Sequence, residues 1–265
     1  MVLRSPNITV MSNAAYKAAR GLVRDFGEVE QLQVSRKGTA DFVSQADLAA
    51  EKALRRELEK ARPAYGFLME ESGESPSRDG EHRWIVDPLD GTTNYLHGIP
   101  HFCISIALER AGEIVCAVIY DPVRDEMFRA EKGVGAYHND RRMRVSGRRQ
   151  LADAVIATRS PHAGAEGHET HARQLAAVTA QTAGVRNFGA AALDLAYIAA
   201  GRYDGYWDGG LQPWDIAAGL LLVRESGGFV SEVGGGHNMM QSGSILAAND
   251  HLHLPLGKLL RKAVG

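Results

Sequence analysis

Residues 84–94 read Trp-Ile-Val-Asp-Pro-Leu-Asp-Gly-Thr-Thr-Asn, and this stretch is the most informative in the chain. An apolar run typical of a strand leads into Asp87, and the fixed φ of Pro88 keeps that aspartate extended. We expect the chain to turn here, so that Asp90 returns beside Asp87. Gly91 and the two threonines after it are small enough to leave their backbone N–H groups accessible at the start of a helix, where anions bind. The stretch therefore predicts two carboxylates beside a site for an anion.

Two neighbouring carboxylates repel each other, and both repel an anion placed next to them. A hard divalent cation removes both conflicts. A ligand set made only of oxygen atoms suits Mg²⁺, which keeps part of its water shell and bridges to phosphate. The alternative is a loop with an aspartate that caps a helix, as Asp90-Gly91 alone would suggest. The proline, the paired aspartates and Gly-Thr-Thr occur together, and this coincidence favours the metal site.

Three further acidic segments lie where strands end or helices begin. Glu70 and Glu71 follow a short apolar run, although a glutamate pair alone is usually a solvated surface feature. Asp47 follows an alternating segment and, taken alone, would belong to the cap of the next helix. Asp215 lies at the head of a strongly apolar helix, where a lone aspartate is an ordinary N-cap. None of these segments is decisive by itself.

The hydrophobic pattern divides the chain into two halves. Helical spacing predicts helices over 8–26 and 48–61. The strands expected in the first half are 84–87, 104–110, 113–121, 126–131 and 135–139. From about residue 150, strands and helices alternate, and a last helix ends at Ala263. We therefore expect an α+β half with an antiparallel sheet over residues 1–148 and an α/β half over residues 149–265.

The composition argues against several classes of protein. The chain has 265 residues with 30 basic and 32 acidic side chains, a net charge of −2, which disfavours nucleic-acid binding by bulk electrostatics. No apolar run approaches the ~20 residues of a membrane span and no signal peptide is recognisable, so we expect a cytoplasmic protein. Cys103 and Cys116 are expected to be reduced core residues, because nothing near them would lower a thiol pKa. The arginine-rich segment 141–149 is expected to be a solvated hairpin and linker.

Several of these segments together resemble the signature blocks of the inositol monophosphatase family. The blocks are DFVSQAD (41–47), MEESG (69–73), WIVDPLDGTTNY (84–95), GAAALDLAYIAAG (189–201) and WDIAAG (214–219). They occur in the family's order, and the similarity spans roughly residues 10 to 250. The resemblance implies a layered α-β-α-β-α sandwich of the inositol monophosphatase and sugar phosphatase type. It also implies a Mg²⁺-dependent, lithium-sensitive phosphatase that forms a homodimer.

The resemblance further implies roles for individual residues. The first Mg²⁺ would be held by Glu70, Asp87 and the main-chain carbonyl of Leu89, and the second by Asp87, Asp90 and Asp215. A third, weaker ion would lie by Glu70. Thr92, supported by Asp47, would orient the attacking water and help to deprotonate it, so that Asp47, Glu70 and Thr92 are the expected catalytic set.

The substrate would also be bound by residues from both halves. The resemblance implies that the amides near Gly91 and Thr92 hold the phosphate and that Asp90 is also a substrate-binding residue. Gly189, Ala190, Ala191 and Asp208 would line the pocket for the alcohol part. Asp208 stands where animal members of the family carry glutamate, and Gln212 stands where they carry histidine. Both differences concern the side of the pocket that recognises the alcohol.

The predicted function is hydrolysis of inositol monophosphate to myo-inositol and phosphate by a metal-activated water. Fructose-1,6-bisphosphate or a nucleotide (bis)phosphate are alternative substrates on the same scaffold. A non-catalytic scaffold that binds a protein partner is a third possibility. The acidic residues needed for the chemistry are all present, which favours an enzyme.

Overall fold

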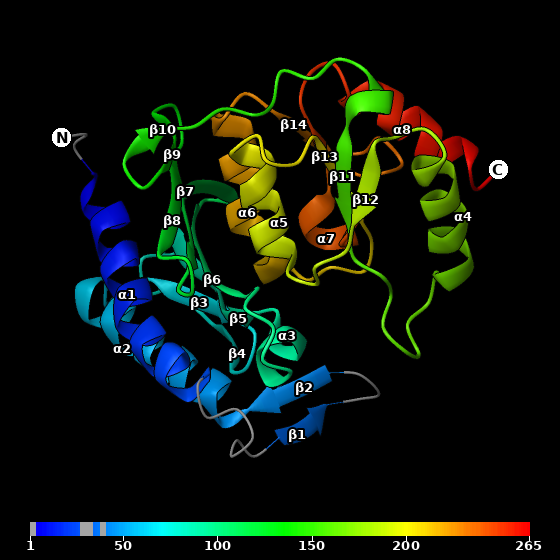
Figure 1. The fold of residues 1–265 in the computed structure, drawn as a ribbon. Helices are drawn as coiled ribbons and strands as arrows, with labels where there is room; N and C mark the ends of the chain where they lie inside the picture. Colours follow the sequence, from blue (N-terminus) through cyan, green and yellow to red (C-terminus); the bar gives the residue numbers. More distant parts are fainter. Residues whose placement is uncertain (1–3, 27–33, 38–40) are drawn as a thin grey trace.

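The computed structural model describes residues 4–26, 34–37 and 41–265, with 34–37 and 41–44 described by their backbone alone. Within these residues it contains two large sheets and a two-stranded antiparallel sheet, β1-β2 (Figure 1). The larger sheet has eight strands in the order β10-β9-β8-β7-β6-β5-β3-β4. The smaller sheet has five strands in the order β12-β11-β13-β15-β14. The first sheet is built from residues before Met143 and the second from residues after Ala154.

The elements of the first half agree closely with the predicted helices and strands. They are α1 (Pro6–Phe26), β1 (Val34–Lys37), β2 (Asp41–Ser44), α2 (Gln45–Ala61), β3 (Gly66–Met69), β4 (Gly73–Ser75), β5 (His82–Asp90), α3 (Thr92–Leu96), β6 (Cys103–Arg110), β7 (Glu113–Asp121), β8 (Glu126–Glu131), β9 (Gly135–His138) and β10 (Arg141–Arg142).

The second half alternates between strands and helices, as predicted. Its elements are the 3-10 helix η2 (Leu151–Asp153), β11 (Val155–Thr158), α4 (His168–Thr179), β12 (Gly184–Arg186), α5 (Ala191–Ala199), β13 (Gly205–Asp208), α6 (Pro213–Glu225), β14 (Phe229–Ser231), α7 (Met239–Ser242), β15 (Ile245–Ala248) and α8 (His253–Lys262).

Strand direction follows the predicted pattern with one exception in the first sheet. Strands β5 to β10 are joined by antiparallel pairings, as expected for the first half. Strand β3 runs parallel to β5 and brings the turn that follows Met69 beside the end of β5. In the second sheet β11 is parallel to both neighbours, whereas β15 is antiparallel to β13 and β14. The parallel β3–β5 pair matters for function, because it places two acidic segments at one sheet edge.

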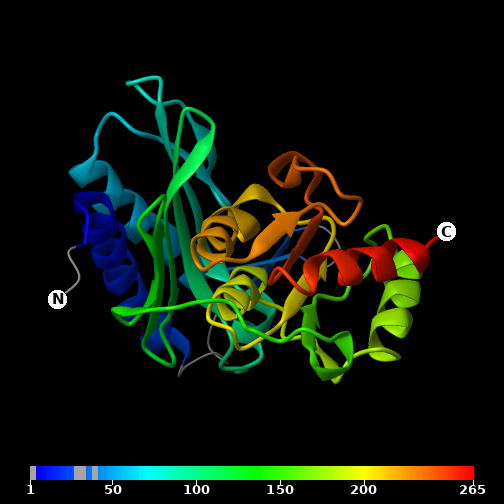
Figure 2. The ribbon, with the colours of Figure 1, turned by 90° about the horizontal axis from the view of Figure 1, so that it is seen from above.

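The elements stack in five layers (Figure 2), which confirms the predicted α-β-α-β-α sandwich. Helices α1 and α2 cover the outer face of the eight-stranded sheet and share a core with its strands. Helices α5 and α6 lie between the two sheets, where one continuous core joins β5–β9 to β13 and β15. Helices α4 and α8 cover the outer face of the five-stranded sheet. Two helices of the second half thus cover the sheet built by the first half.

The two cysteines lie in the core, and the arginine-rich segment lies at the surface. Cys103 and Cys116 are both buried and free, and burial raises the pKa of the Cys116 thiol to about 12. The arginines of segment 141–149 are exposed, and after β10 the segment has no regular structure. In the described part of the chain, no helix has the length and apolar content to cross a membrane.

The contact between α5 and α6 is unusually close, because it depends on a glycine. Gly219 of α6 faces Leu195 of α5, and a Cβ atom at Gly219 would lie 2.4 Å from Leu195 Cδ1. Gly21 of α1 has the opposite surroundings, since a Cβ there would meet nothing within 4 Å. Both glycines lie within helices, so each loses the same helix propensity relative to alanine.

We expect opposite effects from alanine at these two positions. Gly21→Ala should raise the free energy of unfolding by about 0.5–1 kcal/mol, the gain in helix propensity. Gly219→Ala should lower it by about 1–3 kcal/mol, because the clash with Leu195 outweighs the same gain. Urea unfolding of the two variants beside the wild type measures both. Stabilisation by Gly219→Ala would contradict the close α5–α6 packing.

Candidate active site

The informative stretch continues as a strand where we expected a turn. Strand β5 extends through Pro88 to Asp90, and its register against β6 shifts between Asp87 and Asp90. Asp87 is opposite Ser105 and Asp90 is opposite Cys103, so β5 carries one extra residue there. This is a β-bulge, which a proline favours because it has no N–H to donate to the ladder. The bulge brings Asp87 and Asp90 to one cavity, as the predicted turn would have done.

Gly91 ends the strand and begins the short helix α3. Its φ of +94° is a left-handed conformation that glycine adopts without strain. A Cβ atom at this position would also lie 3.0 Å from the carbonyl oxygen of His101. The helix start predicted after Gly91 is confirmed, and Thr92 is its first residue.

The Asp90 carboxylate is bound by the N-terminus of α5. Its oxygens accept hydrogen bonds from the backbone N–H groups of Ala191 (3.2 Å), Ala192 (2.8 Å) and Leu193 (3.4 Å). The first turn of a helix has N–H groups without intrahelical partners and a partial positive charge, so it stabilises a carboxylate. This interaction joins the end of β5 to a helix of the second half.

The carboxylates at the end of β5 are nevertheless unfavourable as anions. Asp87 is 2% exposed, and burial, together with the charges of Glu70 and Asp90, raises its pKa well above the usual range. Burial and the nearby Asp215 raise the pKa of Asp90 to about 7. Asp87 Oδ1 also accepts a hydrogen bond from the Leu89 N–H at 2.9 Å, which fixes the carboxylate in the bulge. A cation would relieve the charge that these groups carry when ionised.

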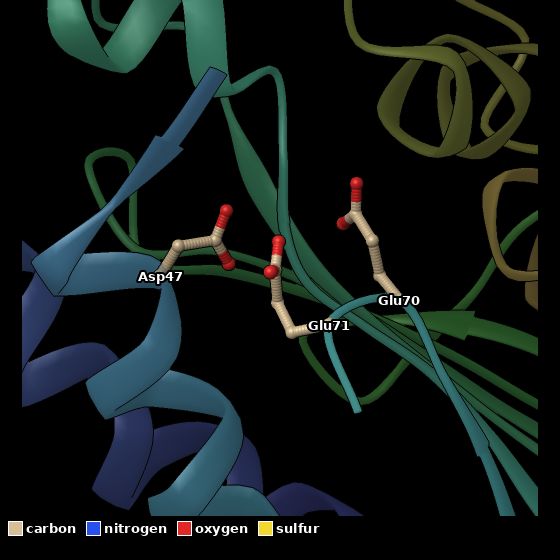
Figure 3. Close-up of side chains that lie close together, drawn as sticks. All are labelled: Asp47, Glu70 and Glu71. Carbon is tan, nitrogen blue, oxygen red and sulfur yellow. The ribbon is translucent and has the colours of Figure 1, made fainter. Parts of the chain in front are cut away.

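A second acidic cluster joins α2 to the turn after β3 (Figure 3). Carboxylate oxygens of Asp47, Glu70 and Glu71 lie within 4.8 Å of one another. Glu51 lies one helical turn after Asp47, and its Oε2 accepts a hydrogen bond from the Glu71 N–H at 2.9 Å. Helix α2 thus provides one carboxylate of the cluster and holds the turn that carries the other two. Glu71 was not among the predicted site residues, although it is adjacent to Glu70 in the sequence.

Asp215 comes to the site at the beginning of α6. It is the third residue of the helix, and its Oδ2 accepts a hydrogen bond from the N–H of Gln212 at 2.8 Å. Gln212 is the N-cap residue, so the two form a capping box. Asp215 therefore caps α6, as a lone aspartate at a helix start would, and it also lines the cavity.

The Thr92 hydroxyl lies between an acid and a carbonyl. Thr92 Oγ1 is 2.9 Å from the carbonyl oxygen of Leu89 and 3.5 Å from Asp47 Oδ2. A hydroxyl has one proton to donate and two lone pairs that can accept. Thr92 can therefore donate to one of these oxygens and accept a hydrogen bond from a molecule in the cavity.

One cavity of about 460 Å³ brings together most of the predicted site residues. Those that line it are Glu70, Asp87, Leu89, Asp90, Gly91, Thr92, Gly189 and Asp215. Asp47 is fully buried and reaches the cavity through Thr92. Ala190 and Ala191 are also buried, and Ala191 acts on the site through its hydrogen bond to Asp90.

Asp208 lies beside this cavity and is bound to an arginine. It lines an adjoining cavity of about 550 Å³, and its Oδ2 accepts hydrogen bonds from Arg159 Nε at 3.2 Å and Tyr206 Oη at 2.8 Å. The N–H of Gly209 donates to the other carboxylate oxygen at 2.7 Å. Arg159 was not predicted as a site residue. The only signal in the sequence was an arginine directly after an apolar strand.

The donor set of the cavity fits a hard divalent cation. Carboxylate oxygens come from Glu70, Asp87, Asp90 and Asp215, and Leu89 adds a carbonyl oxygen. Oxygen donors of this kind suit Mg²⁺, Mn²⁺ or Ca²⁺, whereas Zn²⁺ sites are typically built from Cys and His. The raised pKa values of Asp87 and Asp90 point the same way, because a bound cation would favour their ionised forms.

Comparison with known proteins finds a matching family model and relatives of similar length. A family model described as the inositol monophosphatase family matches residues 4–264. The chain is 54% identical over 261 residues to an inositol-1-monophosphatase of Rhizobium meliloti, covering 98% of each chain. It is 42% identical over 248 residues to a Nus factor SuhB of Pseudomonas aeruginosa, covering 92% of each.

A solved structure extends the agreement to the fold. The extragenic suppressor protein suhB of Bartonella henselae matches with a TM-score of 0.96 and 57% identity, over 98% of this chain and 100% of that chain. The match of sequence and fold thus covers nearly the whole length, including every block around the acidic cavity. This chain belongs to the inositol monophosphatase family.

Proposed function

We propose that this chain is a Mg²⁺-dependent phosphomonoesterase that hydrolyses inositol monophosphate to myo-inositol and phosphate. The observation that carries the proposal is a single cavity that combines Glu70, Asp87, Asp90 and Asp215 with the Thr92 hydroxyl, in a member of a metal-dependent family. The name of the Rhizobium meliloti relative supports inositol monophosphate as the substrate. The family resemblance also supports a cytoplasmic homodimer that uses two ions, with a third beside Glu70.

The proposed metal ligands are Glu70, Asp87, Asp90, Asp215 and the Leu89 carbonyl. When bound there, Mg²⁺ would neutralise the phosphate charge and lower the pKa of a coordinated water. The chain holds these ligands in place through backbone hydrogen bonds, from Leu89 to Asp87, from α5 to Asp90 and from Gln212 to Asp215. Groups fixed in this way need little rearrangement during the reaction.

Thr92 and Asp47 are proposed to move the proton of the attacking water. A water beside Thr92 can donate a hydrogen bond to Oγ1 while the hydroxyl donates its own proton to Asp47 Oδ2, 3.5 Å away. The water oxygen then attacks phosphorus, and the bond from phosphorus to the alcohol oxygen breaks. The alcohol oxygen takes a proton from solvent, and Asp47 releases the proton that it received through Thr92 to solvent, which restores the site. The backbone N–H groups near Gly91 and Thr92 are proposed to hold the phosphate oxygens during this displacement.

A second candidate function is binding of a protein partner. Its support is the 42% identity to a relative named Nus factor SuhB. A partner-binding scaffold with a decayed active site would be expected to have lost some acidic ligands, yet all of those proposed are present. Binding of a partner and catalysis are compatible in one chain.

Removal of the divalent ion should abolish turnover. We expect no phosphate release from inositol monophosphate in excess chelator and full recovery with Mg²⁺. Ca²⁺ should bind and yet support little turnover, since it lacks the strict octahedral preference of Mg²⁺. Mg²⁺ at about 100 times its Kd should raise the free energy of unfolding by about 2.7 kcal/mol. Li⁺ should inhibit in the same assay. Full activity in excess chelator would contradict the proposal.

Neutralising Asp87 should separate metal binding from folding. Asp87→Asn should lower kcat by more than about a hundredfold, beyond the usual cost of losing an outer-shell partner. Because the folded protein raises the pKa of Asp87, its ionised form destabilises the metal-free protein above the ordinary pKa of 3.8. The metal-free variant should therefore melt at or above the wild-type temperature at pH 7, and this difference should disappear below about pH 4.

The control for Asp87→Asn is Asp153→Asn, at an exposed aspartate outside the cavity. Thermal melts with and without Mg²⁺ complete the comparison. Stabilisation by Mg²⁺ should be reduced in Asp87→Asn and retained in Asp153→Asn. Equal stabilisation of both variants would exclude Asp87 as a ligand.

Removing the Thr92 hydroxyl should slow the proton transfer. Thr92→Val keeps the side-chain shape and should lower kcat by about 10²–10⁴, the usual contribution of general acid–base catalysis. Thr92→Ser keeps the hydroxyl and should retain most of the activity. Steady-state kinetics at saturating Mg²⁺ measure both variants, and circular dichroism checks that both fold. If valine and serine lowered kcat equally, the hydroxyl would have no part in the reaction.

A further inference from the structure

Two adjoining cavities meet at Arg159. The first contains the proposed metal ligands, and the second, of about 550 Å³, extends between α4 and the end of β13. Arg159, His162 and Gly210 line both cavities. The second cavity therefore continues from the active site on the side away from Glu70 and Thr92. A substrate whose phosphate lies at the metal ligands can direct its alcohol part toward Arg159.

Asp208 fixes the Arg159 guanidinium in position through one of its three nitrogens. Within residues 4–26, 34–37 and 41–265, its one hydrogen bond runs from Nε to Asp208 Oδ2. Its terminal nitrogens, Nη1 and Nη2, have no hydrogen-bond partner in this part of the chain. The side chain is 34% exposed, so these nitrogens can be reached from the cavities. An arginine with two free donors is suited to bind a phosphate or a carboxylate in a forked geometry.

Asp208 acts here as the support of the arginine. The side chain is 6% exposed, and both of its oxygens already accept hydrogen bonds, from Arg159, Tyr206 and Gly209. A carboxylate engaged in this way has little capacity left for substrate hydroxyls. The terminal nitrogens of Arg159, and not the carboxylate of Asp208, are therefore the groups of this pair that can bind a polar group of the substrate.

Asp208 balances the formal charge of Arg159 in the second cavity, so what the arginine offers an anion there is its terminal N–H donors. His162 and His171 also line it, and its acidic residues are Asp208 and Glu166. Asp208 is bound to Arg159, whereas Glu166 is exposed at the surface, where solvent and salt screen its charge. Asp215 and Asp90 also act on Arg159 from the first cavity, and both are proposed ligands of the cation.

We propose that Arg159 binds a second oxyanion on the alcohol part of the substrate. This inference rests on the proposed phosphatase function and extends its substrates to phosphate esters that carry a distal phosphate or carboxylate. Inositol monophosphate would remain a substrate that leaves the terminal nitrogens of Arg159 unused. The shared chemistry is a distal oxyanion, and the test separates phosphate from carboxylate.

The test uses three esters that differ only at carbon 6 of the sugar. They are glucose 1-phosphate, glucose 1,6-bisphosphate and glucuronic acid 1-phosphate, measured as initial rates with saturating Mg²⁺. For the wild type, kcat/KM should be higher for at least one of the two doubly anionic esters than for glucose 1-phosphate. Arg159→Gln should lower that ratio by about 10- to 100-fold, the cost of losing charge-assisted hydrogen bonds. The change should be mainly in KM, because the group is remote from the reacting phosphorus.

Two further variants complete the design. Arg149→Gln removes an exposed arginine outside both cavities and should leave the ratio at the wild-type value. The double variant Arg159→Gln/Asp208→Asn removes both charges of the ion pair, so the result does not depend on an unpaired Asp208. It should show the same loss of preference as Arg159→Gln.

The outcomes separate this inference from the proposed function. Turnover of the esters with an equal ratio in wild type and Arg159→Gln would overturn the inference and leave the phosphatase intact. An equal loss for all three esters would assign Arg159 to the fold or the metal site and would also overturn it. Absence of turnover on every ester, inositol monophosphate included, would overturn the proposed function and the inference with it.

Discussion

The binding of the Asp90 carboxylate by the first backbone amides of α5 is the interaction on which the site depends. It places a residue from the end of β5 against a helix that begins about 100 residues later in the chain. The bulge in β5 and the left-handed Gly91 both orient the chain for this contact. The Asn94 side chain adds a second link, because its Nδ2 donates to the carbonyl oxygen of Phe188 at 2.5 Å. The cavity is therefore formed only when α5 lies against the first sheet.

Much of this arrangement could be predicted from the sequence because its signals are local. The alternating strands and the helices each bury one side of a regular element, so their periodicity is visible in a short window. The stretch around Asp87 and Asp90 contains a proline, two acids and a glycine whose conformational preferences act within a few residues of each other. Asp215 was likewise recognisable at the head of an apolar helix. The family blocks then supplied the order of the layers, which no local signal contains.

What could not be predicted depends on contacts between distant segments. The parallel pairing of β3 with β5 has no short-range signal, and it is this pairing that brings Glu70 and Glu71 beside the end of β5. In the sequence, Glu71 could not be distinguished from a solvated glutamate. In the structure, Glu51 of α2 accepts a hydrogen bond from the backbone N–H of Glu71 and so fixes its position. The ion pair of Arg159 with Asp208 joins residues 49 positions apart, so neither residue alone revealed it. The expected turn after Asp87 was wrong for another reason: proline and glycine are common both in turns and next to bulges, and the pairing with β6 that distinguishes the two is a long-range contact.

The position of α5 and α6 between two sheets has a consequence for synthesis on the ribosome. The eight-stranded sheet is complete once Arg142 has emerged, yet the helices that cover its inner face end only at Glu225. At a synthesis rate of about 5–20 residues per second, this apolar face stays uncovered for on the order of ten seconds. Helix α6 depends on the sheet in turn. Its residues Ile216 to Val223 are all buried in the finished protein, so the isolated helix has no polar side to present to water. The nascent chain is therefore most open to chaperones and to aggregation in the interval before these two helices are released.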